Sequence, residues 1–528
     1  MGQRPIELER KRGALPRTPA SFLKRKRGKK NKPKTVFSAG ELRGFAKVHF
    51  RLARKIRVFA EVHHLTGSKA LRLKPHLSPE KNEVFLFSKV FGIFKPFFQK
   101  GLKRGMGQRP IDIEKIKGKE MRAFERFLKY VKYGTGSSEA TGCTPSTEGQ
   151  RKLAEALAEE LCSLGIKAEC DETGYVYAKI PASAGYEKAT SVGFIAHMDT
   201  SPECSGENVA PRITENYDGG DIDIGNGTVL RRSDFPHLPA LRGKTLITAS
   251  GDTLLGADDK AGIAEIMTLA ERLISGEIPH GEVCIAFTPD EEIGEGADHF
   301  DVKRFGAVYA YTVDGDAAGG VEYENFNASA AEVEIKGFSV HPGSAKDTMI
   351  NASLTAMEYN ALLPAADIPR HTEGYQGFYH LCSMEGDVSS ARLKYIIRDH
   401  SAAMLSYRES FMKRAAELLN DKYGAGTVTV TVREQYQNMA EIVAKHYHII
   451  EKALTAAEKA GVKPFISPIR GGTDGARLSF MGLPCPNLGT GGRAFHGPYE
   501  HITVEAMDEV TDILKNIVSE YAAEAVQR

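Results

Sequence analysis

The stretch SVGFIAHMDT, residues 191–200, indicates the fold most directly. Its first six residues are apolar or small without alternation, which is typical of a strand covered on both faces. It then turns polar at His197 and Asp199. Open α/β sheets place their functional groups at the carboxyl ends of such strands. The stretch therefore predicts a buried strand with potential metal ligands at one end.

Two further segments have the same form. EVCIAF, residues 282–287, leads into TPDEE, and AVYAYTV, residues 307–313, leads into Asp314. Between the first and second strands, residues 263–273 place apolar side chains at helical spacing. Buried strands that alternate with helices predict an α/β fold with a central, mostly parallel sheet. Upstream, Thr147 and Gln150 could form a capping box for a leucine-rich helix.

The pattern changes near residue 328. Apolar and polar residues alternate over 331–336 and 428–432, and a strand at 391–398 and a helix at 408–420 lie between them. Alternation indicates strands with one wetted face, hence an antiparallel sheet with helices on the other face. We expect residues 328–434 to be an inserted α+β domain. The α/β pattern resumes with a helix at 440–460, so residues 119–327 and 435–528 should form one catalytic domain.

Composition excludes several classes of protein. A chain of 528 residues is too long for one ordinary core, and 41% hydrophobic with 26% charged residues is typical of soluble globular proteins. The seven cysteines are odd in number and never spaced C-x-x-C. This excludes a disulfide scaffold and a cysteine zinc finger, and it favours the reducing cytoplasm. No apolar run is long enough to span a bilayer.

Charge divides the chain into two unlike parts: residues 1–105 carry a net charge of +22 and the rest −20. The tract 24–34 is basic without an apolar face, so we expect this extension to be disordered or surface-bound. It could bind nucleic acid or act as a targeting segment. Residues 1–13 repeat residues 106–118 at eight of thirteen positions, so a true start could lie at Met106 or Met121. We favour an extension without a role in the chemistry.

Five segments are dense in nitrogen and oxygen ligands: residues 197–199, 256–260, 289–292, 313–316 and 495–497. Each alone has an ordinary explanation, because polar strand ends and acidic surface runs are common. Together, and without a nearby cysteine, they favour a zinc, manganese or cobalt site rather than a structural thiolate site.

The motifs HMDTSPE (197–203), LLGADDKAG (254–262), TPDEEIGEG (288–296), VDGD (313–316), HPGSAK (341–346), RGGTDG (470–475) and FHG (495–497) occur in this order. On them, the part from about residue 121 to 528 resembles the dinuclear zinc aminopeptidase, carboxypeptidase and aminoacylase family, and within it the tripeptide aminopeptidases. The basic extension has no counterpart in that family.

The resemblance implies a role for each matching residue. His197 and Asp314 should bind one zinc ion, Glu292 and His496 the other, and Asp258 should bridge the two, with cobalt or manganese able to substitute. Asp199 should orient His197. Glu291 should act as general base on a hydroxide that bridges the metals. Asp259 has no assigned role.

The resemblance also implies how substrate is held. His341, from the inserted domain, should reach the active site of the other subunit and stabilise the oxyanion, so that the inserted domain is both lid and dimerisation element of a homodimer. Arg398 should bind the substrate carboxylate, although it could instead be an exposed strand cation. The Gly-Gly pair after Arg470 lets backbone approach the substrate, or forms a plain loop.

These implications predict a cytoplasmic dizinc aminopeptidase that releases the N-terminal residue of tripeptides, without membrane association. A related dipeptidase, carboxypeptidase or aminoacylase would share all five ligands. A third possibility is a binding protein with a vestigial metal site, in which the basic extension binds nucleic acid. The complete ligand set and Glu291 argue against it.

Overall fold

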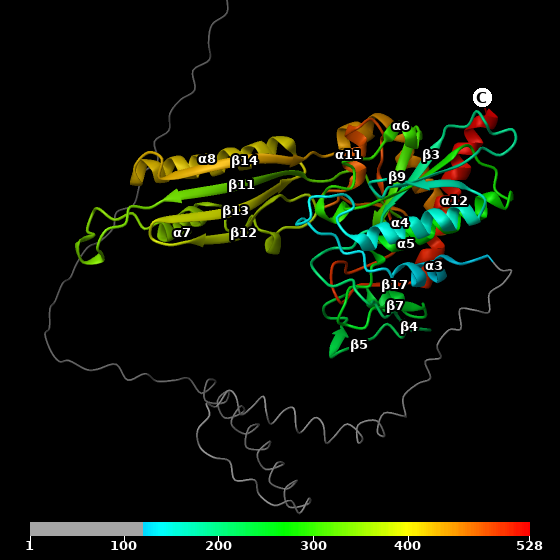
Figure 1. The fold of residues 1–528 in the computed structure, drawn as a ribbon, viewed down its shortest axis with the longest axis horizontal. Helices are drawn as coiled ribbons and strands as arrows, with labels where there is room; N and C mark the ends of the chain where they lie inside the picture. Colours follow the sequence, from blue (N-terminus) through cyan, green and yellow to red (C-terminus); the bar gives the residue numbers. More distant parts are fainter. Residues whose placement is uncertain (1–119, 528) are drawn as a thin grey trace, which may run out of the picture. The chain divides into compact units, whose positions relative to one another are not determined.

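The core of the molecule is an eight-stranded mixed sheet in the computed structural model, which describes residues 120–527 (Figure 1). In spatial order its strands are β1 (Lys167–Cys170), β2 (Val176–Ile180), β8 (Val283–Thr288), β3 (Val192–His197), β9 (Tyr309–Gly315), β16 (Asn487–Gly489), β10 (Gly320–Glu322) and β15 (Phe465–Ile466). The central strands β8, β3, β9 and β16 are parallel, whereas the β1–β2, β2–β8 and β10–β16 pairs are antiparallel. The predicted α/β fold is confirmed, and its parallel part is the centre of the sheet.

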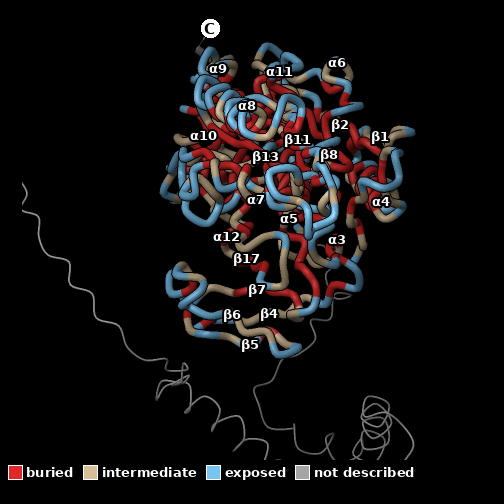
Figure 2. The backbone as a smooth tube through the Cα atoms, turned by 90° about the vertical axis from the view of Figure 1, so that its left-hand side faces the viewer, coloured by how far each residue is buried: buried red, intermediate tan, exposed pale blue. Residues whose placement is uncertain are grey.

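Both faces of the central strands are buried, as their unbroken apolar runs predict (Figure 2). Phe194 of β3 packs in the larger core cluster, and its neighbour Ile195 packs in a second cluster on the opposite face. Gly193, which precedes Phe194 in β3, faces the second cluster, where a Cβ would be 2.4 Å from the Phe305 ring. The covering helices are α3 (Ala123–Tyr130), α4 (Glu148–Ser163), α5 (Ala257–Ile274), α10 (His448–Lys459) and α12 (Val504–Gln527) with the first cluster, and α6 (Val302–Phe305) and α11 (Asp474–Phe480) with the second.

Two helix predictions differ from the structure. The helix expected at 440–460 is divided into α9 (Ala440–Val443), a 3₁₀ turn at Ala444–His446 and α10. Thr147 is the N-cap residue of α4, but its side chain caps no backbone amide. The Gln150 side chain donates to the Thr147 hydroxyl at 3.2 Å and also bonds to Asp290, 140 residues away in the chain. A distant partner thus replaces the local capping box.

Residues 327–436, here called the insertion, form a separate four-stranded antiparallel sheet between β10 and β15 of the chain. Its spatial order is β12 (Phe378–Gly386), β13 (Ser390–Asp399), β11 (Asn327–Lys336) and β14 (Val428–Tyr436). Alternate residues of β11 and β13 pack with α7 (Ala352–Leu362) and α8 (Ala402–Tyr423) in a cluster of their own. The other face of the sheet is polar, as the alternation predicts.

The remaining strands form two small sheets beside the central one. They are β4 (Arg212–Thr214), β7 (Leu246–Thr248) and β17 (His501–Thr503) in one, and β5 (Ile222–Gly225) and β6 (Thr228–Leu230) in the other. Within the described residues, no helix is both long and apolar enough to cross a membrane. The predictions for the basic extension and for the repeat at 106–118 lie outside the described residues.

Candidate metal centre and active site

The carboxyl ends of three parallel strands bring the predicted ligands together. His197 is the last residue of β3 and pairs with Thr288, the last residue of β8, and Asp314 lies near the end of β9. Glu291 and Glu292 follow β8 in a short 3₁₀ turn. Neighbouring parallel strands end at one edge of the sheet, so these side chains converge there.

The His197 ring is fixed on both sides. Its Nδ1 lies 3.1 Å from the Asp199 carbonyl oxygen and 3.3 Å from the Asp199 carboxylate. Its Nε2 lies 2.9 Å from Asp258 Oδ1 and 3.3 Å from Asp314 Oδ1. A proton on Nδ1 donated to Asp199 leaves the Nε2 lone pair directed at the two carboxylates, which is the tautomer a metal ligand requires.

Asp258 lies between two groups of donors. Its Oδ1 contacts His197, and its Oδ2 lies 3.3 Å from His496 Nε2. The same His496 nitrogen lies 3.1 Å from Glu292 Oε2. One carboxylate therefore joins a His197–Asp314 group to a His496–Glu292 group, which is the arrangement that the resemblance implied.

The charges of this cluster fit a cation. Asp258 and Glu292 raise the pKa of His496 to about 11, while burial raises the pKa of Glu292 to about 7. Burial opposes ionisation of Asp258, yet its bonds to the two histidines hold its pKa below the ordinary value. The buried Glu292 Oε1 has no hydrogen-bond partner within residues 120–527. A buried, unpaired carboxylate oxygen beside imidazole nitrogens fits a divalent metal ion.

Glu291 lies beside the ligands without being used by them. Its backbone amide and that of Glu292 donate to the two carboxylate oxygens of Asp199, at 3.0 and 3.1 Å. Burial, and then the charge of Asp314, raises the pKa of Glu291 well above its ordinary value. A carboxylate with a raised pKa next to a metal centre suits proton transfer near neutral pH.

Two further acids, Asp259 and Glu500, shape the loop around Asp258. Asp259 accepts from the backbone amides of His197 and Gly262, at 3.1 and 3.2 Å, and it also offers an oxygen within 4.8 Å of ligand atoms of His197 and Asp314. Glu500 accepts from the amides of Leu255, Gly256 and Asp258, at 2.7, 2.9 and 3.0 Å. The only sequence signal for Glu500 was its position four residues after His496.

Arg398 is buried, with 9% exposure, so it is not the solvent-facing strand cation that the sequence left open. Its Nη1 donates to the carbonyl oxygens of Ser329 and Ile397, and its guanidinium lies 5.1 Å from the centre of the Tyr436 ring. The pKa of Tyr436 is raised by burial first and also by the charge of Glu291, whereas Arg398 lowers it. The charge of Glu291 therefore acts on the Arg398–Tyr436 pair.

His341 is not brought to this cluster. It lies in the exposed loop after β11, where its Nδ1 accepts from the Gly343 amide at 3.1 Å. Ten strand residues of β11, roughly 33 Å at the usual rise, separate that loop from the start of the insertion. Arg470 also has a different partner set: it donates to Gly374, Gln376 and Thr372 of the insertion, so it ties the Gly-Gly loop to that unit.

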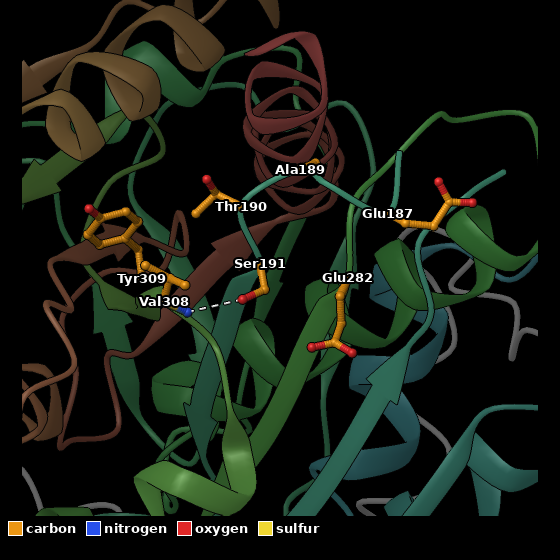
Figure 3. Close-up of a pocket in the computed structure, with 7 residues that line it drawn as sticks. All are labelled: Glu187, Ala189, Thr190, Ser191, Glu282, Val308 and Tyr309. Carbon is orange, nitrogen blue, oxygen red and sulfur yellow. Dashed lines mark hydrogen bonds between the residues drawn. The ribbon is translucent and has the colours of Figure 1, made fainter. Parts of the chain in front are cut away.

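The opposite edge of the central sheet carries an open pocket of about 530 Å³ (Figure 3). Its lining includes Ser191, Glu282 and Tyr309, which lie at the amino ends of the parallel strands. The dashed line in Figure 3 marks the Val308 amide donating to the Ser191 hydroxyl at 3.2 Å. This pocket does not contain any of the predicted site residues.

An α/β sheet that gathers carboxylates and a histidine at the ends of its parallel strands, with a second histidine from a later loop, has the donor set of a metallopeptidase. Residues 254–520 match the peptidase family M20/M25/M40, and the chain belongs to this family. Peptidase T from Clostridium perfringens is 54% identical over 400 residues, which cover 75% of this chain and 98% of the relative.

Solved structures show the same fold. The aminopeptidase PepT from Bacillus cereus superimposes with a TM-score of 0.61 at 24% identity, covering 76% of this chain and 98% of the other. The YXEP protein of Bacillus subtilis, a dinuclear metal binding peptidase of the M20 family, has a TM-score of 0.50 at 15% identity, over 75% and 97% of the two chains.

Proposed function

We propose that this protein is a dinuclear metallo-aminopeptidase that removes the N-terminal residue of tripeptides. The observation that carries the proposal is Asp258, which is shared by two groups of nitrogen and oxygen donors with Glu291 beside them. The similarity to peptidase T, which covers 98% of that relative, supports tripeptides as substrates rather than the substrates of a dipeptidase, carboxypeptidase or aminoacylase.

His197 and Asp314 would hold one divalent ion, and Glu292 and His496 the other, with Asp258 between them. We propose zinc as the ion, with cobalt or manganese as substitutes, because the donors are imidazole and carboxylate without thiolate. Such ions polarise a scissile carbonyl and make a water molecule acidic enough to attack it near neutral pH.

The protein's own groups then control the proton and the geometry. Glu291 would accept the proton of the attacking water and return it to the leaving amine, since its carboxylate is not engaged as a ligand. Asp199 would hold the ring of His197 and, through the two amides of the turn, the positions of Glu291 and Glu292.

Arg398 would bind the substrate carboxylate, supported by its burial and by the Tyr436 ring against its guanidinium. This contact would lie a fixed distance from the metals and so measure peptide length. His341 would act in the site of a second subunit, because β11 carries it away from its own metal centre. The insertion, which we identify with the predicted domain 328–434, would thus serve as lid and dimerisation unit of a homodimer.

All seven cysteines are free, which supports a reducing compartment, and we propose the cytoplasm. Nucleic-acid binding by residues 1–105 stays a prediction.

The test is a hydrolysis panel with the full chain: a tripeptide, the matching di- and tetrapeptides, and the tripeptide with a blocked amino or carboxyl end. We expect the free tripeptide to be the best substrate, with activity lost on exhaustive chelation and restored by zinc, cobalt or manganese. Undiminished hydrolysis by protein shown to be metal-free by elemental analysis would exclude the proposed centre. Preference for an N-acylated substrate would instead favour an aminoacylase.

A further inference from the structure

The turn that carries Glu291 and Glu292 begins at a strained residue. Asp290 has φ +59°, in the left-handed region that residues with a Cβ rarely adopt. It is fully buried and follows the end of β8 by two positions. Surrounding contacts must therefore hold this conformation, and through it the direction in which the next side chain, Glu291, points.

Those contacts come from Ser146 and Gln150, at the start of α4. Asp290 Oδ2 accepts from the Ser146 amide at 2.8 Å, and Oδ1 accepts from the Ser146 hydroxyl at 2.5 Å and from Gln150 Nε2 at 2.7 Å. The Asp290 amide donates to Gln150 Oε1 at 3.1 Å. Gln150 and Asp290 thus meet in a reciprocal pair, and both are inaccessible to solvent.

The three consecutive amides of the turn are all anchored by side chains. The Gln150 side chain accepts from the Asp290 amide, and the Asp199 carboxylate accepts from the amides of Glu291 and Glu292. The Gln150 side chain does not cap its own helix, and a leucine would pack as well against the core if packing were its only task. The Gln150 side-chain amide instead pairs with the carboxylate and the backbone amide of Asp290.

We propose that Gln150 is a positioning residue that, through Asp290, aims the Glu291 carboxylate. This inference rests on the proposed function in one respect: Glu291 is taken as the general base. A group displaced by about 1 Å can lose on the order of 10²-fold in rate. Loosening of the Asp290 turn should therefore appear mainly in kcat.

The first experiment replaces Gln150 by methionine, which keeps its volume and removes its donor and acceptor. For Gln150→Met, we expect kcat for a tripeptide to fall about 10- to 100-fold, with KM changed by less than about twofold. In a Glu291→Gln background the same substitution should cause no further loss, because the group it positions is already disabled. A further loss of similar size would overturn the proposal, as would an unchanged kcat in the single variant.

A second readout needs no metal and no substrate. In the metal-free protein, amide hydrogen exchange of peptides spanning residues 288–296 should become faster in Gln150→Met, while peptides from β11 and β13 stay unchanged. Unaltered exchange of the turn would contradict the anchor even if activity fell. If the wild-type chain hydrolyses no tripeptide, the proposed function fails, and this exchange measurement still decides whether Gln150 holds the turn.

A polarity swap separates the specific pair from general damage. Gln150→Glu places a carboxylate against Asp290, and Asp290→Asn places an amide against Gln150; each single variant should be impaired. Together they restore a donor–acceptor pair, because the new amide donates to the new carboxylate and still accepts from the Ser146 amide. We expect the kcat of the double variant to be at least tenfold higher than that of the worse single variant. The control Leu157→Val, a buried α4 residue remote from the turn, should lower the melting temperature without lowering kcat.

Discussion

Glu291 and Glu292 are neighbours in the chain but differ in what surrounds them. Glu292 Oε2 lies against His496, whereas the Glu291 carboxylate has no such ligand contact among the described residues. We therefore expect Glu291→Gln to lose about 10²- to 10⁴-fold in turnover while it retains about two metal ions per chain. Glu292→Gln should instead weaken one metal site. Elemental analysis after dialysis, paired with kcat, distinguishes them; metal loss in the first variant and retention in the second would mean that the two roles are reversed.

Arg398 permits a prediction about substrate length. If its guanidinium binds the terminal carboxylate, Arg398→Ala should hydrolyse tripeptides poorly and narrow the difference in kcat/KM between a free tripeptide and its C-terminal amide. A dipeptide would place its carboxylate about 3.3–3.6 Å short of the contact. Lys394, an exposed β13 residue, offers the matched control Lys394→Ala, which should leave the ratio unchanged. A ratio unaltered by Arg398→Ala would remove this arginine from substrate binding.

At the scale of residues, a candidate site residue could be predicted from the sequence where it lies at, or just after, the end of a strand. His197, Asp314 and the Glu291–Glu292 pair could be found in that way, because strand ends converge on one edge. Glu500 and Gln150 could not: their partners, Asp258 and Asp290, lie 242 and 140 positions away, and nothing in a local pattern specifies such pairs.

At the scale of elements, α5 carries a buried acid that the proposed chemistry does not use. Glu265 is inaccessible to solvent, and neither of its carboxylate oxygens has a hydrogen-bond partner within the part of the chain that the structure describes. Burial, and then the charge of Asp508, raises its pKa well above the ordinary value. The folded protein therefore holds this proton at pH values where the unfolded chain has released it.

The sign of the effect follows from that difference. Above the ordinary carboxyl pKa, the unfolded state binds fewer protons than the folded state, so stability falls as pH rises, by up to about 1.4 kcal/mol per pH unit, until the folded-state pKa is reached. Glu265→Gln removes this pH-dependent loss of stability, because glutamine does not ionise. We expect the melting temperature of the metal-free variant, relative to wild type, to rise steadily from pH 5 to pH 8. The exposed Glu159→Gln on α4 is the control and should show no such trend; a constant difference for Glu265→Gln would show that its burial is not coupled to protonation.

The helix expected at 440–460 shows where element prediction was wrong. Its apolar spacing is real over α10, where Ile449, Ile450 and Ala453 are buried, but the chain tightens into a 3₁₀ turn at Ala444–His446. There the Tyr309 hydroxyl lies 3.4 Å from His446 Nδ1. A tertiary contact of this kind accompanies the break, and periodicity alone does not show it.

At the scale of the whole molecule, the proposed exchange of His341 between subunits can be tested by combining two inactive variants in one dimer. Glu291→Gln and His341→Ala should each be nearly inactive as homodimers. In a mixed dimer, the chain with an intact Glu291 receives an intact His341 from the other subunit, so one of its two sites is complete. We expect random mixing by co-expression to restore about a quarter of wild-type activity. Activity equal to the weighted sum of the two variants would place His341 outside the partner's site.

Asp199 has a consequence beyond its individual bonds. This single, fully buried side chain contacts a proposed ligand of each ion, His197 and Glu292, and the backbone of the proposed base Glu291. Because all three groups contact Asp199, we expect a displacement of Asp199 to move them together, so that their separations change less than their positions. Small motions of the surrounding protein should therefore leave the relative positions of His197, Glu291 and Glu292 nearly unchanged.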